Sequence, residues 1–264
     1  MKKEIEANRN SWNLLAKDHY AVFKKALMEQ ANLLNPDIIE ELGDLKGKSL
    51  IHMQCNTGAD TLCLSRMGAK VSGVDLAPDN ILYARKLFAD FKEEGHFYES
   101  DILEFTETHH QKYDVVFTSE GAIIWLPDLK KWARTARKLI KDDGFFYVNE
   151  MHPFFLMFDE SEFPNHKLVL KYPYFGRKPE TCDSIGGYAA ETRPGINYSW
   201  MYSISDVVNA LIEAGFLIEF IHEFDSLCYD LGGMEKIGTS HWQYPDLKGK
   251  MPFMFSIKAT VRKN

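Results

Sequence analysis

The sequence predicts an α/β protein with a doubly wound, mostly parallel sheet, and three observations lead to that prediction. Short apolar runs of strand length alternate with amphipathic helical patterns from residue 49 to about residue 150. Turn residues separate these patterns, since Gly68 closes one helix and Pro78 opens the next at a position that favours proline. The chain of 264 residues, 45% of them hydrophobic, can bury a large core without disulfides or metals. Strands separated by helices form parallel sheets with helices on both faces.

The alternating part of the chain supplies five strands and the helices between them. We expect strands at residues 49–53, 70–74, 96–99, 113–118 and 145–148. We expect helices at residues 60–67, from Pro78 to a stop at Gly95, and at 128–140, followed by an Asp-Asp-Gly turn at 142–144. Because βαβ crossovers are right-handed, these connections also fix the hand of the sheet.

Elements on both sides of the alternating part extend this plan. The apolar residues of 10–34 fall near a 3.6-residue period, which predicts a long N-terminal helix. A helix at 205–214 and strands at 216–224 and 252–261 bring the expected sheet to seven strands. The chain therefore divides into an N-terminal helical cap (1–43), a core (44–150 and 204–264) and an insert after the fifth strand (151–203).

The insert differs in composition from the rest of the chain. Its 53 residues include 11 aromatic residues and five of the ten prolines, and only short strands at 166–175 and 196–202 are expected within it. Loops of this length are uncommon and usually functional. An aromatic excess can mean a rich core or a pocket for an apolar ligand, and its concentration in one insert favours the pocket.

Charge and cysteine usage restrict the class of protein. Acidic residues outnumber basic ones by 38 to 31, which argues against a broad nucleic-acid or anionic-membrane surface. The first residues lack the apolar region of a secretory signal, and no apolar run approaches the roughly 20 residues that span a bilayer. The four cysteines form no CxxC pair, so disulfide and zinc sites are disfavoured and a reducing cytoplasm is expected.

The turn after the first strand is the first candidate for a ligand site. It reads Gln54-Cys55-Asn56-Thr57-Gly58 and leads from a strand into a helix. In a doubly wound sheet this turn lies at the carboxyl edge of the strands, where ligands bind. Small residues let the backbone approach a ligand, and the helix N-terminus offers free N–H groups to an anion.

Two acids end the next two strands. Asp75 lies 17 positions after Gly58 and is placed to accept the hydroxyl protons of a ribose. Asp101 ends the third strand and is followed by Ile102, a pair that suits the amine and the ring face of an adenine. The order of these residues at successive strand ends predicts an adenosine-containing ligand.

The run from Leu50 to Glu150 resembles the class I S-adenosylmethionine-dependent methyltransferases, and the strand plan continues the resemblance to Val261. That family has a Rossmann-like sheet and usually a Gly-x-Gly-x-Gly turn, whose glycine positions here hold Gln54, Asn56 and Gly58. The Gln-Cys-x-x-Gly form resembles a variant of some small-molecule methyltransferases.

The resemblance implies a role for each strand end. The turn residues Gln54, Cys55, Asn56 and Gly58 would border the methionine part of S-adenosylmethionine. The remaining contacts would be Asp75 and Leu76 at the ribose and adenine, Asp101 and Ile102 at the adenine, Ser119 and Glu120 near the methyl group, and Tyr20 on a helix that closes over the cofactor.

The predicted reaction is in-line methyl transfer to a small, partly apolar or aromatic molecule. The protein would align the acceptor with the S–CH₃ bond, and the insert would form a lid and most of the acceptor pocket. His152, directly after the fifth strand, is the expected general base, and Glu120 either contacts substrate or cofactor or bonds a loop backbone. No metal site is expected, because no His, Asp or Glu spacing resembles a ligand set.

Other functions remain open at this point. A non-catalytic protein that senses S-adenosylmethionine would need only the cofactor site. A nicotinamide-dependent oxidoreductase also binds ribose through an acid after the second strand, but it expects Gly-x-Gly-x-x-Gly, and this turn holds only Gly58. The expected partner is a small-molecule acceptor, with no nucleic acid and no membrane, for a monomer or a homodimer.

Overall fold

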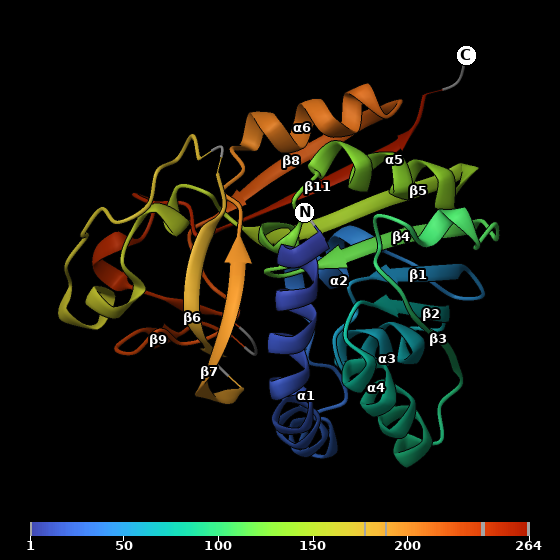
Figure 1. Cartoon of the computed structure of the whole chain (residues 1–264), viewed down its shortest axis with the longest axis horizontal. Helices are drawn as coiled ribbons and strands as arrows, with labels where there is room; N and C mark the ends of the chain where they lie inside the picture. Colours follow the sequence, from blue (N-terminus) through green and yellow to red (C-terminus); the bar gives the residue numbers. More distant parts are fainter. Residues whose placement is uncertain (1, 177, 188, 239–240, 263–264) are drawn as a thin grey trace.

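The computed structural model describes residues 2–176, 178–187, 189–238 and 241–262 and contains the seven-stranded sheet that the sequence predicts. Its strand order is β3-β2-β1-β4-β5-β11-β8, and β11 runs opposite to the other six strands of this sheet (Figure 1). The strands are β1 (Ser49–Met53), β2 (Lys70–Asp75), β3 (Gly95–Glu99), β4 (Tyr113–Ser119), β5 (Ile140–Met151), β8 (Phe216–Phe224) and β11 (Met254–Val261).

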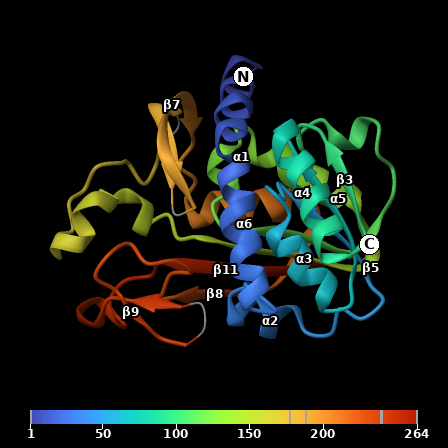
Figure 2. The same ribbon diagram turned by 90° about the horizontal axis from the view of Figure 1, so that it is seen from below.

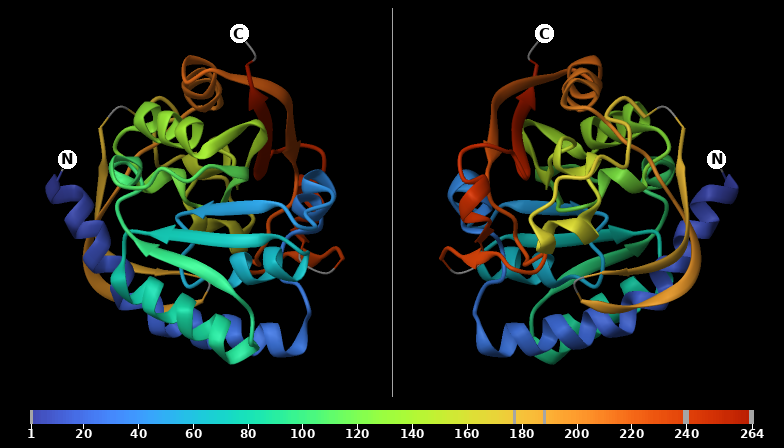
Figure 3. Two further views of the ribbon diagram at one scale, coloured as in Figure 1. Left: turned by 90° about the vertical axis from the view of Figure 1, so that its right-hand side faces the viewer. Right: turned by 90° about the vertical axis from the view of Figure 1, so that its left-hand side faces the viewer.

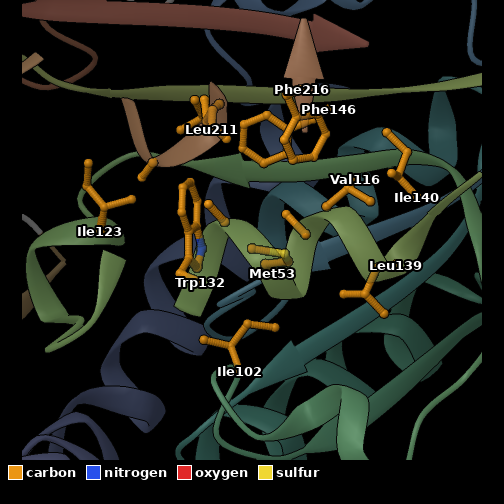
Figure 4. Packing of buried hydrophobic residues seen from close by; sticks show 14 of the residues in the cluster. Met53, Ile102, Val116, Ile123, Trp132, Leu139, Ile140, Phe146, Leu211 and Phe216 are labelled. Atoms are coloured by element: carbon orange, nitrogen blue, oxygen red, sulfur yellow. The ribbon is translucent and has the colours of Figure 1, made fainter. Parts of the chain in front are cut away.

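Helices cover both faces of this sheet. Two helices lie on one face, α5 (Leu129–Leu139) and α6 (Ile204–Glu213). The other face carries α1 (Lys2–Glu29), α2 (Pro36–Leu42), α3 (Ala59–Arg66) and α4 (Pro78–Phe91). Strand side chains alternate between the two faces, so Val116 packs under α5 while Phe117 packs under the N-terminal helices. Figure 4 shows the first of these cores, in which the rings of Trp132 and Phe146 meet edge to face 5.5 Å apart.

The fifth strand is longer than the predicted 145–148. Residues 142–144 do not form the separate turn expected from Asp-Asp-Gly but lie within β5. The pairing with β4 shifts there, since Tyr113 faces Ile140 and Val115 faces Phe145. A bulge thus absorbs the extra residues and lets the strand continue, which local turn residues alone do not reveal.

The N-terminal helix is displaced from its predicted range of 10–34. It begins at Lys2 and ends at Glu29, and a separate short helix, α2, follows. Asn35 caps α2 by accepting from the N–H of Asp37, with Pro36 in the first helical position. Because a residue before proline avoids the α conformation, the helical pattern cannot run through this point.

The insert forms a hairpin rather than the expected strands. Its two strands, β6 (Glu180–Gly187) and β7 (Ala190–Ser199), pair antiparallel and lie against α1 (Figure 2). The strand predicted at 166–175 is wrong, because only Leu170 forms an isolated bridge, with Phe158. The strand predicted at 196–202 is the end of β7. One aromatic residue of the insert, Tyr188, lies outside the described residues.

Three phenylalanines of the insert build a third hydrophobic core. Phe155, Phe158 and Phe163 are 0%, 7% and 1% exposed, so they do not line an open pocket. They pack with side chains of residues 225–253, the stretch between β8 and β11, in which the sequence predicted only the first two residues of the strand at 252–261. The buried partners from this stretch and the start of β11 are Leu227, Met234, Tyr244, Met251, Phe253 and Met254. These aromatic residues therefore serve as core, contrary to the interpretation of the excess as an acceptor pocket.

Helix α1 lies between the β6–β7 hairpin and α4, and both side views show it running beside α4 (Figures 2 and 3). Asn8 and Tyr198 join it to β7 by a reciprocal pair of hydrogen bonds, 2.9 and 2.7 Å long. No helix in the described ranges is both long and apolar enough to cross a membrane.

Candidate functional site

The loop after β1 adopts left-handed backbone at its glycine-like positions even where the residue is not glycine. The φ angles of Gln54, Asn56 and Gly58 are 60°, 49° and 79°. Such angles are uncommon outside glycine and strain the loop unless other contacts hold it. Gln54 has such contacts, because its Nε2 donates to the carbonyl of Ala122 (2.8 Å) and its Oε1 accepts from Trp132 Nε1 (3.2 Å). Gln54 thereby joins the β1 loop to the loop after β4.

Asn56 and Gly58 complete the loop in different ways. Asn56 Oδ1 accepts from the N–H of Thr57, and the amide of Asn56 contacts Nδ1 of His19 on α1, which lies 3.1 Å from Nδ2 and 3.3 Å from Oδ1. At Gly58 a Cβ atom would lie 3.0 Å from the Cβ of Ala84 on α4. Glycine is therefore required there both by its φ angle and by the close approach of α4.

Asp75 lies at the end of β2, as predicted, and its carboxylate binds the protein's own donors. Oδ2 accepts from the N–H of Asn56 (2.8 Å), while Oδ1 accepts from Ala77 N–H (2.9 Å) and Asn80 Nδ2 (3.0 Å). Burial raises the pKa of Asp75, and these hydrogen bonds oppose that rise. The backbone N–H of Leu76 is a further donor to this carboxylate.

The predicted adenine contacts lie at the next strand end. Asp101 accepts from the N–H of Leu103 (2.9 Å), and burial raises its pKa. Ile102 is 4% exposed and points into the core beside Met53 (Figure 4), whereas Leu76 is only half-buried. Of the two apolar residues, Leu76 has the more accessible surface, and the adenine roles of both stay predictions.

A chain of hydrogen bonds runs beneath the end of β4. Nδ1 of His52 lies 2.9 Å from Oγ1 of Thr61, and its Nε2 lies 3.2 Å from Oγ of Ser119. Ser119 Oγ in turn donates to Oδ2 of Asp60 (2.8 Å). Because Ser119 donates to Asp60, Nε2 of His52 carries the proton and donates to Ser119. Burial lowers the pKa of His52 to about 3, so this imidazole is neutral.

Glu120 follows Ser119 and has an uncommon backbone angle and, within the described residues, an unpaired carboxylate oxygen. Its φ angle is 21°, and its Oε1 is fully enclosed without a hydrogen-bond partner in the described part of the chain. Burial, together with the negative charges of Asp60 and Glu150, raises the pKa of Glu120 to about 8. Its one side-chain partner is the thiol of Cys228. Glu120 does not bond a loop backbone through Oε1, which was the structural alternative for this residue.

Glu150 is a site residue that the sequence reasoning missed. It is completely buried at the end of β5, and its carboxylate accepts four backbone N–H groups. The donors, at 2.5–3.1 Å, are Gly121, Ala122, Ile123 and Met151. The sequence does contain a signal for Glu150, because this acid ends an apolar strand, as Asp75 and Asp101 do. Glu150 fixes the loop that follows Glu120.

Two predicted site residues have other partners. Nδ1 of His152 accepts from the N–H of Phe154 (3.0 Å), and its Nε2 lies 2.8 Å from Oε1 of Glu223, so both ring nitrogens are occupied. The Tyr20 hydroxyl bonds Asp90, and its ring stacks on Tyr83 with 5.0 Å between centroids. Tyr20 thus joins α1 to α4, and His152 has no ring nitrogen free to take a proton from a substrate in this arrangement.

Helix α1 covers the strand ends. Beyond the contact of His19 with Asn56, the ring of Trp12 meets Trp125 edge to face at 5.3 Å. A shallow surface hollow of about 420 Å³ lies farther along, between α1 and β7. In the described ranges no group of three or more His, Cys, Asp or Glu side chains could hold a metal ion.

Known proteins resemble parts of this chain. A family model described as "Methyltransferase domain" matches residues 51–146. A ubiquinone biosynthesis O-methyltransferase from Hydrogenovibrio crunogenus is 23% identical over 125 residues, which cover 47% of this chain and 52% of that protein. The chain therefore matches about half the length of this curated relative.

Solved structures share the fold at low sequence identity. A putative S-adenosylmethionine-dependent methyltransferase from Listeria monocytogenes has a TM-score of 0.57 at 17% identity, over 85% of this chain and 95% of that one. The complex of DhpI with SAH has a TM-score of 0.59 at 14% identity and covers 100% of both chains. These likenesses confirm the predicted α/β class, with its mostly parallel seven-stranded sheet.

Proposed function

We propose that this chain, which belongs to the class I S-adenosylmethionine-dependent methyltransferases, transfers a methyl group from S-adenosylmethionine to a small molecule. The fold and the methyltransferase domain support the class of reaction. The acceptor and the roles of individual residues are part of the proposal.

The placement of Asp75 is the observation that carries the cofactor assignment. Its carboxylate ends β2 beside the β1 loop, at the carboxyl edge of the sheet where doubly wound folds bind ligands. We propose that a ribose hydroxyl also bonds this carboxylate. Asp101 at the next strand end suits an adenine amine, and Ser119 and Glu120 at the end of β4 suit the region near the methyl group.

The chemical step needs alignment more than activation. The sulfonium of S-adenosylmethionine is already a good methyl donor, so the protein gains most by holding the acceptor in line, worth roughly 7–11 kcal/mol. Glu120 is the better of the two candidate bases, because its carboxylate has an oxygen without a partner, whereas both nitrogens of His152 are bonded. A carboxylate with a raised pKa accepts a proton near neutral pH.

Calorimetry with purified protein tests the cofactor assignment. We expect S-adenosylmethionine and S-adenosylhomocysteine to bind and NAD⁺ not to bind. Asp75→Ala should weaken S-adenosylmethionine binding tenfold or more, because the ribose loses a charged acceptor. Asp142→Ala, an exposed acid at the far end of β5, is the matched control and should bind like the parent protein. Equal affinity of the Asp75→Ala variant would remove Asp75 from the ribose site.

A non-catalytic sensor of S-adenosylmethionine is the second candidate. Its support is the β1 loop, where two glycine-like positions hold Gln54 and Asn56 and where α1 lies directly on the loop through His19. Labelled S-adenosylmethionine separates the two functions. Label that reaches an acceptor from a metabolite extract supports the enzyme, whereas tight binding with only slow hydrolysis supports the sensor.

A further inference from the structure

We propose that the methyl acceptor is an amine, bound as a cation between Asp60 and Glu120. This inference rests on the proposed methyltransferase function and names its substrate class. It places the acceptor against buried carboxylates rather than against the aromatic side chains of the insert.

Neither carboxylate has a cationic partner among the described ion pairs. Those pairs join other acids to lysine, arginine or histidine, for example Asp114 to Lys141 and Glu213 to Lys130. Among the described residues, Asp60 accepts a hydrogen bond from the neutral hydroxyl of Ser119, and Oε1 of Glu120 accepts none. Burying two acids without a cationic partner reduces the stability of the fold, and a bound cation would offset that loss.

The surroundings of the two acids are polar as well. Ser119 on β4 pairs in register with Asn149 on β5, and Asn149 pairs with Ser256 on β11, so the three side chains lie in one row on the same face. Asn149 and Ser256 are both 0% exposed. The backbone N–H of Glu120 donates to the carbonyl of Asn149 (2.8 Å), which places Glu120 at the end of this row. This row therefore places polar side chains next to Ser119, the residue that donates to Asp60.

Burial raises the pKa of Asp60, and the hydrogen-bond chain beneath the site opposes that rise. The neutral His52 donates to Ser119, and Ser119 donates to Asp60, so the last donor in the chain stabilises the carboxylate form. Asp60 can therefore hold the cation, while Glu120, whose pKa is raised to about 8, can exchange a proton with it.

The proposed step balances in protons and electrons. The acceptor enters as R–NH₃⁺, and the Glu120 carboxylate takes one proton to give R–NH₂ and a carboxylic acid. The nitrogen lone pair then forms the C–N bond as the S–CH₃ bond breaks, and its electron pair stays on sulfur in the neutral thioether. The product is R–NH₂⁺–CH₃, and Glu120 returns its proton to water. An alcohol would bring no positive charge to these two acids.

Binding to the protein saturated with S-adenosylhomocysteine tests the proposal. The probes are amines paired with their alcohols: ethylamine with ethanol, phenethylamine with 2-phenylethanol, and tyramine with tyrosol. Each amine should bind at least tenfold more tightly than its alcohol. Ethylamine is included because it is small enough to bind even if the site is too narrow for the larger amines. Glu120→Gln and Asp60→Asn should each remove at least tenfold of the amine affinity. Glu213→Gln, an exposed acid on α6, is the control and should leave amine affinity unchanged.

Three results distinguish the possibilities. Amines that bind no better than alcohols, with S-adenosylhomocysteine still bound, overturn the amine proposal and leave the methyltransferase function standing. Amines that bind only to the free protein, and that S-adenosylhomocysteine displaces, also overturn it, since the acids then hold the amino group of the cofactor. Failure of S-adenosylhomocysteine itself to bind contradicts the proposed function instead. An amine that binds and yields an N-methyl product by mass spectrometry supports both.

Discussion

The two halves of the candidate site treat their carboxylates in opposite ways. At the ends of β2 and β3, Asp75 and Asp101 accept hydrogen bonds from nearby backbone N–H groups, so each acid helps to fix its loop. At the end of β4 and the start of α3, Glu120 and Asp60 receive hydroxyl or thiol donors at most. The carboxylates of the half that we propose for adenosine have donors within the fold, whereas the half that we propose for methyl transfer holds two acids with raised pKa values and no cationic partner among the described residues.

This difference separates residues that stabilise the fold from residues held ready for a ligand. A buried carboxylate with several N–H donors contributes to stability, and one without them reduces it. Glu150 sharpens the contrast, because it lies beside Glu120 and accepts four backbone N–H groups. Since Glu150 fixes the loop, Glu120 is not needed for that purpose. Strain and uncompensated charge of this kind concentrate at functional sites.

The largest expected change in stability concerns Asp75, in the half of the site whose carboxylates accept backbone N–H groups. Asp75→Ala leaves the N–H groups of Asn56 and Ala77 and the amide of Asn80 without their acceptor. We expect the free energy of unfolding to fall by about 2–4 kcal/mol, measured by urea denaturation without cofactor. Asp142→Ala should change it by less than about 0.5 kcal/mol, as is usual for exposed residues. A loss for Asp75→Ala as small as the control would show that the two halves do not differ.

The second prediction is a gain in stability rather than a loss. Glu120→Gln replaces a carboxyl group whose pKa is raised to about 8 with a neutral amide of the same shape. In the folded protein Glu120 holds its proton to higher pH than in the unfolded chain, so its burial costs stability as pH rises from about 4.5 through 8. The variant should therefore gain about 1–3 kcal/mol relative to the parent protein between pH 5.5 and 8.5.

Paired denaturation curves at the two pH values measure this gain. The other titrating groups that face Glu120 are Asp60 on α3, Glu150 on β5 and Cys228 in the stretch between β8 and β11. Their contributions remain in both proteins, although the loss of the Glu120 charge lowers the pKa of Asp60 somewhat. A variant that is less stable than the parent at pH 8.5 would mean that Glu120 is paired, and the contrast between the halves would fail.

The sheet was largely predictable from the sequence because its strands are bounded by local turn residues. The strand predicted at 216–224 matches β8 residue for residue, since Gly215, with a φ angle of 94°, ends the preceding turn. The third core was not predictable in this way. Phe163 stacks on Tyr244 across about 80 positions of sequence, and no periodicity encodes a contact of that range.

The site was predictable only as a set of strand ends. Asp75 and Asp101 lie where the alternation of strands and helices places them, and that pattern requires no side-chain detail. The partners of each acid were not predictable, because they depend on the direction of single N–H groups in the loops. Glu120 and Glu150 are both acids at the ends of apolar strands. The carboxylate of Glu150 accepts four backbone N–H groups, whereas Oε1 of Glu120 has no hydrogen-bond partner among the described residues.

The smallest expected effect tests the link between the two acids and the fold. Ser119→Ala removes the acceptor of His52 Nε2–H and the hydroxyl that donates to Asp60. We expect a loss of about 1–2 kcal/mol in the free energy of unfolding. Without its donor Asp60 holds its proton to still higher pH, so the loss should be larger at pH 8 than at pH 5.

The neighbouring Thr118→Val is the matched control, because the buried hydroxyl of Thr118 has no partner in the described residues and its removal should cost nothing. Equal stabilities of the Ser119→Ala and parent proteins at both pH values would show that Asp60 does not depend on the chain from His52, and that its charge must be held by a different group.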